Sequence, residues 1–274
     1  MIRNIREFMW RKIPLVAYQG MRYCAWYAVI YLPRSLFLWD KRVQPKIQGF
    51  ASSNTSGLMD SLGAINVLSP TEMCRVMTWH GSDKGRIWHN YTVIYSVLFG
   101  KLRNLPLRIF ELGLGTNNPQ LVSTMGVDGQ PGASLRGWRE LFPKAFLYGA
   151  DIDRDILFEE DRIKTFYCDQ LDSVAIRELW SQPELSEGMD IIIDDGLHTF
   201  EGNVSFLEGS LEHLRPGGIY VVEDILGATL DDWRDRLQSV YVPRFPGYEF
   251  ALIELPNDSN SLDNNLLVIR KPVN

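Results

Sequence analysis

Short apolar, β-branched runs alternate with longer segments of helical periodicity over the second half of the chain. The runs that predict parallel strands are 107–113, 145–151, 163–169, 189–195 and 217–224. Between them lie segments such as 199–214, whose pattern predicts a helix that ends before Pro216 and two glycines. Alternating strands and helices are typical of a doubly wound α/β fold, in which helices cover both faces of a mostly parallel sheet.

The last part of the chain has a different pattern. Segments 248–255 and 264–271 predict two strands joined by the polar loop 256–263, which indicates an antiparallel hairpin. The hairpin and the five parallel strands make a seven-stranded sheet. We therefore predict one α/β domain over 71–274, preceded over 1–70 by a basic, aromatic helical arm and a linker that contains Ser, Gly and Asn.

Composition and charge narrow the range of partners. Of the 274 residues, 45% are hydrophobic and 23% are charged, as in an ordinary globular protein. Residues 1–42 hold eight Lys or Arg against two Asp or Glu, so with a net charge of -6 the remainder is strongly acidic. An acidic body repels a phosphate backbone, which excludes nucleic acid as a partner. The cysteines Cys24, Cys74 and Cys168 lie far apart, which argues against a zinc or disulfide framework and favours the cytoplasm.

The basic segment 1–42 leaves two interpretations open. It has neither the cleavage site of a signal peptide nor an uninterrupted apolar run that would span a membrane. One interpretation is an arm packed on its own domain or on a second subunit of a homo-oligomer. The other is a helix in peripheral contact with an anionic membrane, which would place the protein at the inner face of that membrane.

Carboxylates lie at or near the carboxyl end of every predicted parallel strand. Along the chain they are Glu111, Asp151, Asp169, the pair Asp194 and Asp195, and the pair Glu223 and Asp224. Ligands of such sheets bind beyond this edge, where Gly113 and Gly115 form a turn that lets a ligand approach the backbone. The pattern favours an adenosine site, with Asp151 on the ribose hydroxyls and Asp169 on the adenine amino group. For each single aspartate, a helix cap or a pair with an arginine is the alternative.

A dinucleotide site is the weaker interpretation of the glycine turn. The dinucleotide motif would place a third glycine at position 118, where the chain has Asn118. It would also place an acid about 20 residues further on, whereas Asp151 comes much later. A nicotinamide-dependent oxidoreductase and a non-catalytic nucleotide- or glycan-binding module are the alternatives to an enzyme that uses another adenosine cofactor.

Asp195, Glu223 and Asp224 are expected to converge, because the fourth and fifth strands of such a sheet are usually neighbours. Converging carboxylates repel one another, and a hard divalent cation such as Mg²⁺ relieves that repulsion. The alternatives are that Asp194 or Asp195 caps the following helix and that Glu223 pairs with Lys or Arg. His198 would lie at the N-terminus of that helix, which predicts a lowered imidazole pKa and a neutral general base.

Six segments in this order resemble class I S-adenosylmethionine-dependent methyltransferases, and more narrowly the Mg²⁺-dependent sugar O-methyltransferases of macrolide biosynthesis. They are GSDKGRIWHNYT (81–92), FELGLGT (110–116), GASLRGWRELFPKAFLYGADI (132–152), CDQLD (168–172), DDGLH (194–198) and GGIYVVEDI (217–225). The resemblance implies a Rossmann-like fold with S-adenosylmethionine and Mg²⁺ as cofactors.

The resemblance also implies a role for each matching residue. Asp195, Glu223 and Asp224 would hold Mg²⁺, and His198 would be the base. The residues that would line the cofactor are Glu111, Gly113 and Gly115 at its methionine end, Asp151 at its ribose, and Asp169 and Gln170 at its adenine. The layout of the metal acid, the base and the paired ligands is also similar to that of catechol O-methyltransferases.

The sequence departs from the macrolide enzymes at three places. Leu197 replaces a serine that is frequent there, the loop 117–130 is longer, and residues 1–70 do not match. The acceptor is therefore not implied by the resemblance. From the basic aromatic N-terminus we expect a sugar hydroxyl of a bacterial surface glycan or a lipid-linked saccharide, with a secondary-metabolite glycoside of the macrolide type as the alternative.

Overall fold

The computed structural model describes residues 45–52, 57–63, Ile65, 71–85, 88–257 and 259–273. Gln44–Asn274 forms one compact unit. The N-terminal arm expected over 1–42, with its contact to a membrane or to a second subunit, lies outside the described residues.

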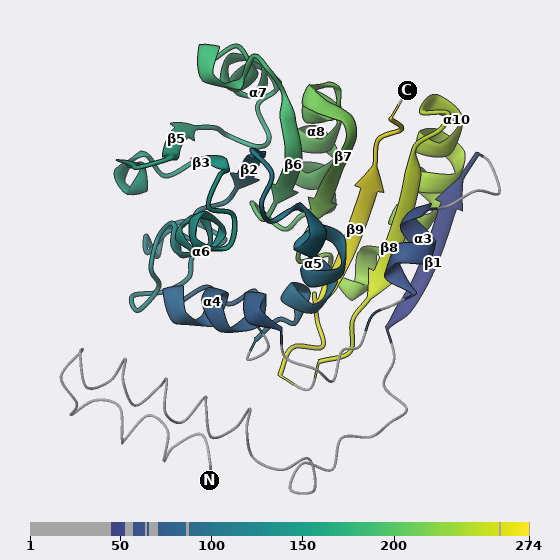
Figure 1. Ribbon diagram of the computed structural model, residues 1–274, viewed down its shortest axis with the longest axis horizontal. Helices are drawn as coiled ribbons and strands as arrows, with labels where there is room; N and C mark the ends of the chain where they lie inside the picture. The colour runs from purple at the N-terminus through teal and green to yellow at the C-terminus, as the bar shows by residue number, and fades with distance from the viewer. Residues whose placement is uncertain are drawn as a thin grey trace, which may run out of the picture. The chain divides into compact units, whose positions relative to one another are not determined.

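A nine-stranded sheet forms the centre of this unit (Figure 1), with the strand order β1-β8-β9-β7-β6-β2-β3-β5-β4. Its strands are β1 (Lys46–Ala51), β2 (Arg108–Leu112), β3 (Phe146–Asp151), β4 (Glu159–Glu160), β5 (Ile163–Tyr167), β6 (Met189–Asp194), β7 (Leu214–Val222), β8 (Glu249–Glu254) and β9 (Asn265–Arg270). The strands from β7 to β5 in this order are parallel, and the other pairs are antiparallel. The structure thus confirms the predicted parallel strands and the C-terminal hairpin.

Two strands exceed the predicted seven. The first, β1, lies in the segment interpreted as a linker, yet it pairs with β8 from Lys46 opposite Glu254 to Ala51 opposite Glu249. None of its residues is buried, so it lacks the apolar alternation that predicts a strand, as is common for an edge strand. The second, β4, has only two residues. The sheet therefore begins before the domain boundary that we placed at residue 70.

The helices form two layers on the sheet (Figure 1). They are α3 (Gly57–Leu62), α4 (Glu72–His80), α5 (Tyr91–Phe99), α6 (Ala133–Leu141), α7 (Ser173–Trp180), α8 (Phe200–Ser210), α9 (Leu230–Arg236) and α10 (Val242–Arg244). Helices α4, α5 and α6 pack together in one layer, and α7 packs against α8 in the other. Within the part of the chain that the structure describes, no helix is both long and apolar enough to cross a membrane.

Successive residues of β2 face these two layers in turn. Phe110 and Leu112 belong to a buried cluster that also contains Trp180 of α7 and Phe206 of α8. Glu111 lies between them and therefore points to the opposite face. A fully buried carboxylate is costly unless it is paired, and this one accepts a hydrogen bond of 2.7 Å from Trp138 Nε1 of α6.

The turn after β2 requires glycine at position 113. Gly113 has a φ of +87°, and an added Cβ would lie 1.8 Å from the carbonyl oxygen of Asp195. We expect Gly113→Ala to lower the free energy of unfolding by about 2–4 kcal/mol, because the main-chain clash adds to the cost of a positive φ. Gly126→Ala is the matched control, with a φ of +75° and no atom within 4 Å of the added Cβ. Equal losses for both variants in urea unfolding would contradict this prediction.

Candidate active site

A cavity of about 260 Å³ lies at the carboxyl ends of the central parallel strands. Eight predicted site residues line it, namely Gly113, Gly115, Asp151, Asp169, Gln170, Asp195, His198 and Asp224. The chain leaves β2 toward β3 on one side, while β6 lies on its other side, so this edge is a topological switch point. The other two predicted residues, Glu111 and Glu223, are fully buried and do not line the cavity.

Asp151, the last residue of β3, is fixed beside the glycine turn. Its Oδ2 accepts a hydrogen bond of 2.7 Å from the backbone N–H of Leu114, and its Oδ1 accepts one of 2.9 Å from that of Asp153. Burial raises the pKa of this carboxyl, although the backbone hydrogen bonds oppose the shift. Each oxygen keeps a lone pair for a further donor, such as a ribose hydroxyl.

Gln170 lines the cavity, but its side-chain amide is already engaged within the protein. Its Nε2 donates to the two oxygens of Asp194 at 2.8 and 3.0 Å, and its Oε1 accepts from the backbone N–H of Leu197 at 2.7 Å. Asp169 is half-buried and accepts from the backbone N–H of Leu171 at 2.9 Å. The carboxylate of Asp169 is therefore the better candidate for a hydrogen bond to an adenine, and Gln170 shapes the cavity wall.

The two adjacent aspartates after β6 have different surroundings. Asp194 is buried and also accepts a hydrogen bond of 3.0 Å from Asn203 Nδ2, and burial raises its pKa to about 7. Helix α8 is capped by Thr199, whose Oγ1 accepts from the backbone N–H of Gly202. The alternative in which Asp194 or Asp195 caps this helix is therefore wrong.

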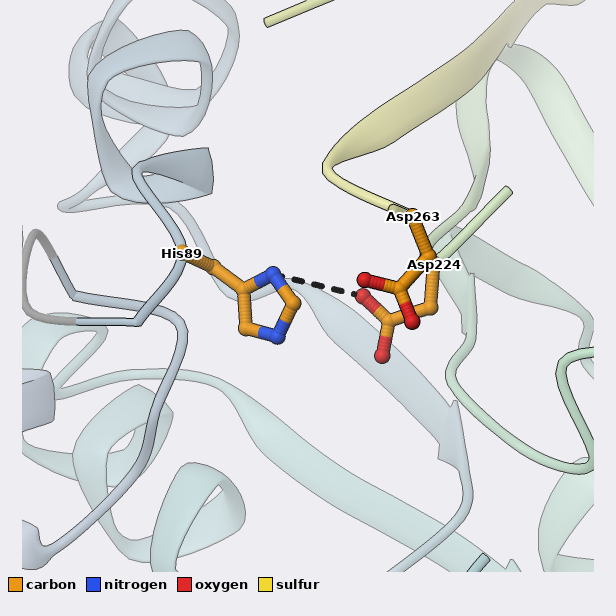
Figure 2. Close-up of side chains that lie close together, drawn as sticks. All are labelled: His89, Asp224 and Asp263. Atoms are coloured by element: carbon orange, nitrogen blue, oxygen red, sulfur yellow. Dashed lines mark ion pairs between the residues drawn. The ribbon is translucent and has the colours of Figure 1, made fainter. Parts of the chain in front are cut away.

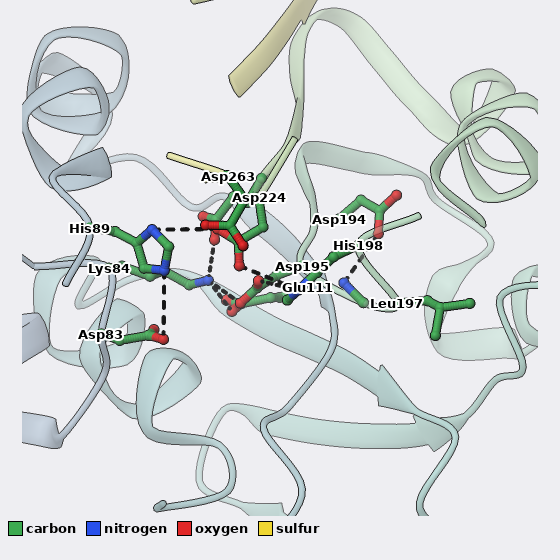
Figure 3. A network of polar contacts seen from close by, with 12 residues as sticks. Asp83, Lys84, His89, Glu111, Asp194, Asp195, Leu197, His198, Asp224 and Asp263 are labelled. Atoms are coloured by element: carbon green, nitrogen blue, oxygen red, sulfur yellow. Dashed lines mark hydrogen bonds and ion pairs between the residues drawn. The ribbon is translucent and has the colours of Figure 1, made fainter. Parts of the chain in front are cut away.

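Asp195, His198 and Asp224 converge at the cavity (Figure 3), with donor atoms that all lie within 4.8 Å of one another. His198 Nε2 lies 3.2 Å from Asp195 Oδ1 and 3.4 Å from Asp224 Oδ2. His198 and Asp224 have φ values of +60° and +53°, which residues other than glycine rarely adopt. Such backbone strain is typical of functional sites.

Lys84 contacts three carboxylates around this cluster, and it was not among the predicted site residues. Its buried ammonium forms ion pairs with Asp195 and Glu223 and lies 3.2 Å from Glu111 Oε1. Figure 3 shows the Lys84 side chain directed toward Asp195 and Glu111. This confirms the alternative in which Glu223 pairs with a lysine. The available signal was indirect: four acids at one edge of a sheet need a cation, and Lys84 belongs to the matching segment 81–92.

Helix α5 holds the two acids that follow β7. The hydroxyl of Tyr95 donates to Glu223, and that of Tyr91 donates to Asp224 Oδ1 at 2.5 Å. The two tyrosines are four residues apart and therefore share one face of the helix. No pattern in the sequence marks either tyrosine, because buried tyrosines at this spacing are indistinguishable from ordinary core residues.

His89, Asp224 and Asp263 form a second group of metal-type donor atoms (Figure 2). His89 Nδ1 lies 3.5 Å from Asp224 Oδ1 and within 3.2 Å of Asn264 Oδ1, and the imidazole ring stacks on Tyr91. These contacts give the His89 ring polar and stacking partners within the protein. They also hold the oxygen of Asp224 that does not face His198.

The pKa predicted for His198 is wrong in direction. His198 precedes the cap of α8, so the nearby carboxylates influence it more than the helix N-terminus does. Burial lowers its pKa, but the hydrogen bond to Asp195 and the charge of Asp224 outweigh burial and raise the pKa to about 10. The imidazole therefore carries a proton at neutral pH as long as no other cation engages these two carboxylates.

The charges of the cluster fit one divalent cation. At formal charges, the four carboxylates of Glu111, Asp195, Glu223 and Asp224 exceed one ammonium and one imidazolium by two negative charges. Burial raises the pKa of Glu223 and of Asp224 in spite of the attraction of Lys84 and His198. A cluster of oxygen donors with this excess suits Mg²⁺.

Cys168 lines the same cavity and is expected to be unreactive. Burial raises the pKa of its thiol to about 12, and the thiolate is the reactive form. We therefore expect iodoacetamide to leave Cys168 unmodified in the folded protein from neutral pH up to pH about 10. Mass spectrometry of the Cys168 peptide, with urea-unfolded protein as the reactive control, measures this. Rapid modification of the folded protein at neutral pH would contradict the prediction.

Comparisons with known proteins agree with the motifs. No protein-family model matches the chain. The tetracenomycin-C rhamnosyl 3'-O-methyltransferase of Streptomyces olivaceus is 34% identical over 157 residues, which cover 57% of this chain and 37% of that protein. Demethylmacrocin O-methyltransferase of Streptomyces fradiae is 32% identical over 179 residues, which cover 62% of this chain and 42% of that protein. The chain thus spans less than half the length of these relatives.

A solved structure has the same fold. The MycE methyltransferase of the mycinamycin biosynthetic pathway, in complex with Mg and SAH, superimposes with a TM-score of 0.54 at 24% identity. The match covers 75% of this chain and 56% of that one. In sequence and in fold, the chain therefore resembles class I S-adenosylmethionine-dependent methyltransferases, and among them the sugar O-methyltransferases of macrolide-type natural products.

Proposed function

We propose that the protein is a metal-dependent O-methyltransferase that moves a methyl group from S-adenosylmethionine to a sugar hydroxyl of a secondary-metabolite glycoside. One observation carries the proposal: a single cavity joins the adenosine-type residues of β2, β3 and β5 to the cluster of Asp195, His198 and Asp224. The cofactor and the acceptor oxygen can therefore meet within it.

The adenosine end of the cavity offers both polar and apolar contacts. Asp151 and Asp169 supply carboxylates for the ribose and the adenine amino group. Ile152 and Leu171, next to them in sequence, also line the cavity, and 45% and 56% of their surfaces are exposed. A planar base needs apolar contacts on its faces and hydrogen bonds at its edge. Exposed apolar side chains beside such carboxylates supply both. We assign Glu111, Gly113 and Gly115 to the surroundings of the methionine end.

The chemistry is assigned to the opposite end of the cavity. Asp195, Glu223 and Asp224 would hold Mg²⁺, which supplies Lewis-acid chemistry that lowers the pKa of an acceptor hydroxyl. His198 Nε2 would accept the hydroxyl proton. This requires a neutral imidazole, and a cation held by Asp195 and Asp224 would weaken the largest of the interactions that raise its pKa.

The deprotonated oxygen would attack the sulfonium methyl group in line, forming a C–O bond as the S–C bond breaks and S-adenosylhomocysteine leaves. The protein would contribute by holding the oxygen and the methyl carbon near contact distance. For the acceptor, the relatives are named for tetracenomycin-C and macrocin glycosides. Their names support the glycoside alternative and give no support to a surface glycan or to the inner membrane face. Cytoplasmic location and a homo-oligomer remain predictions.

Transfer of a labelled methyl group tests this function. The protein is incubated with methyl-labelled S-adenosylmethionine, Mg²⁺ and a panel of rhamnosyl glycosides that carry vicinal diols, and the products are separated by chromatography. We expect a labelled methyl ether of at least one glycoside, and no label in EDTA. Labelled product would exclude the oxidoreductase and the non-catalytic binding module. Transfer that is equal in EDTA would contradict the metal dependence.

A further inference from the structure

We propose that Lys84 is the internal counter-ion of the acid cluster and that its charge sets how tightly the cluster binds a divalent ion. The inference rests on the proposed metal-dependent function and adds a positioning residue to it. Lys84 is the cation that contacts Asp195, Glu223 and Glu111 together, in the part of the chain that the structure describes.

Lys84 is held firmly in place from its backbone to its ammonium. Its side chain is 2% exposed. Its carbonyl oxygen accepts a hydrogen bond from the backbone N–H of Thr92 in the first turn of α5, and that of Asp83 accepts one from His89. The ammonium therefore cannot leave the cluster without breaking its three carboxylate contacts.

The position of the ammonium makes it a competitor of a metal ion as well as a support for the ligands. Two of its partners, Asp195 and Glu223, are among the three residues that we assign to the ion, while Glu111 is not. A lysine and a divalent ion on the same carboxylates repel each other, and buried charges are weakly screened. The charge of Lys84 should therefore weaken metal binding, whereas a purely structural role of its side chain should strengthen it.

These two roles predict opposite changes in metal affinity for the same variant. Lys84→Met keeps most of the side-chain volume and removes the charge. We expect it to bind Mn²⁺ at least about tenfold more tightly than the wild type, because unscreened repulsion between buried cations is large. Its melting temperature in EDTA should fall and should recover when Mg²⁺ is added. Lys101→Met, at an exposed lysine, is the control and should match the wild type.

A second comparison covers the case in which Lys84→Met does not fold. Glu111→Gln removes a buried negative charge at a residue that is not an assigned metal ligand. The double variant Lys84→Met/Glu111→Gln also removes the lysine charge. If the charge of Lys84 acts as proposed, the double variant binds Mn²⁺ at least about tenfold more tightly than Glu111→Gln alone. This pair of variants isolates the lysine charge, because the double variant leaves two carboxylates, Asp195 and Glu223, without the ammonium instead of three.

Calorimetric titration of all the variants with Mn²⁺ at the same pH of about 8, above the pKa of an ordinary carboxyl group, decides the question. Tighter binding after loss of Lys84 supports the inference. Equal or weaker binding in both comparisons overturns it and leaves the proposed function intact. Binding of S-adenosylhomocysteine without any Mn²⁺ binding by the wild type would overturn the metal dependence itself, and the inference with it.

Discussion

Replacement of Asp195 by asparagine is expected to lower kcat by about 10³-fold or more, because a bound metal ion contributes several kcal/mol to such a reaction and about 1.4 kcal/mol corresponds to a factor of ten. The variant loses the carboxylate that contacts both Lys84 and His198. Removal of the metal from the wild type with EDTA should cause a loss of similar size. Methyl transfer to the glycoside identified from the panel measures both effects.

The neighbouring residue supplies a matched control for this prediction. Asp194 has the same side chain, but it is buried and faces Gln170 and Asn203. Because its pKa is raised to about 7, an uncharged asparagine replaces a carboxyl that is already partly protonated. We expect Asp194→Asn to keep kcat within about tenfold of the wild type, since it loses no assigned metal ligand. Similar activity of Asp194→Asn and Asp195→Asn would contradict the assignment of Asp195.

Replacement of His198 by glutamine is expected to lower kcat by about 10²–10⁴-fold, the range typical of the loss of a general base. The affinities for S-adenosylhomocysteine and for Mn²⁺ should stay within about threefold, because glutamine keeps a polar side chain beside the same carboxylates. In the wild type, kcat should decline toward low pH as His198 takes up a proton. The variant should lack this decline.

His213→Gln is the control for the histidine. His213 stacks on Trp180 with ring centroids 4.7 Å apart and does not line the cavity. Its substitution should leave kcat and the pH profile unchanged. If His198→Gln kept both the activity and the acidic decline of the wild type, another group would be the base.

The sequence predicted the central sheet and its acidic edge because both depend on local patterns. Buried parallel strands are continuous apolar runs, and the residues that end them are therefore easy to place. The edge strand β1 lacks this signal, since none of its residues is buried. Its place in the sheet depends on pairing with β8, about two hundred positions later in the chain.

The errors in the candidate site come from contacts between distant segments. Lys84 was missed because its three carboxylate partners follow or lie within β2, β6 and β7, and no spacing in the sequence joins them. The pKa predicted for His198 was wrong because Asp195, three residues earlier, and Asp224, at another strand end, both face its ring. The assignment of Gln170 to adenine stays a prediction, and the engagement of its amide with Asp194 and Leu197 was likewise not visible in the sequence.

Calorimetric titration with S-adenosylhomocysteine, in Mg²⁺ and then in EDTA, measures whether one protein binds both the cofactor and a metal-dependent acceptor. We predict saturable binding of S-adenosylhomocysteine under both conditions, no binding of NADH, and binding of a diol-bearing rhamnosyl glycoside only when Mg²⁺ is present. Such a result would place the cofactor and the metal-dependent acceptor on one protein, as the shared cavity requires. Absence of S-adenosylhomocysteine binding together with saturable binding of NADH would contradict the account.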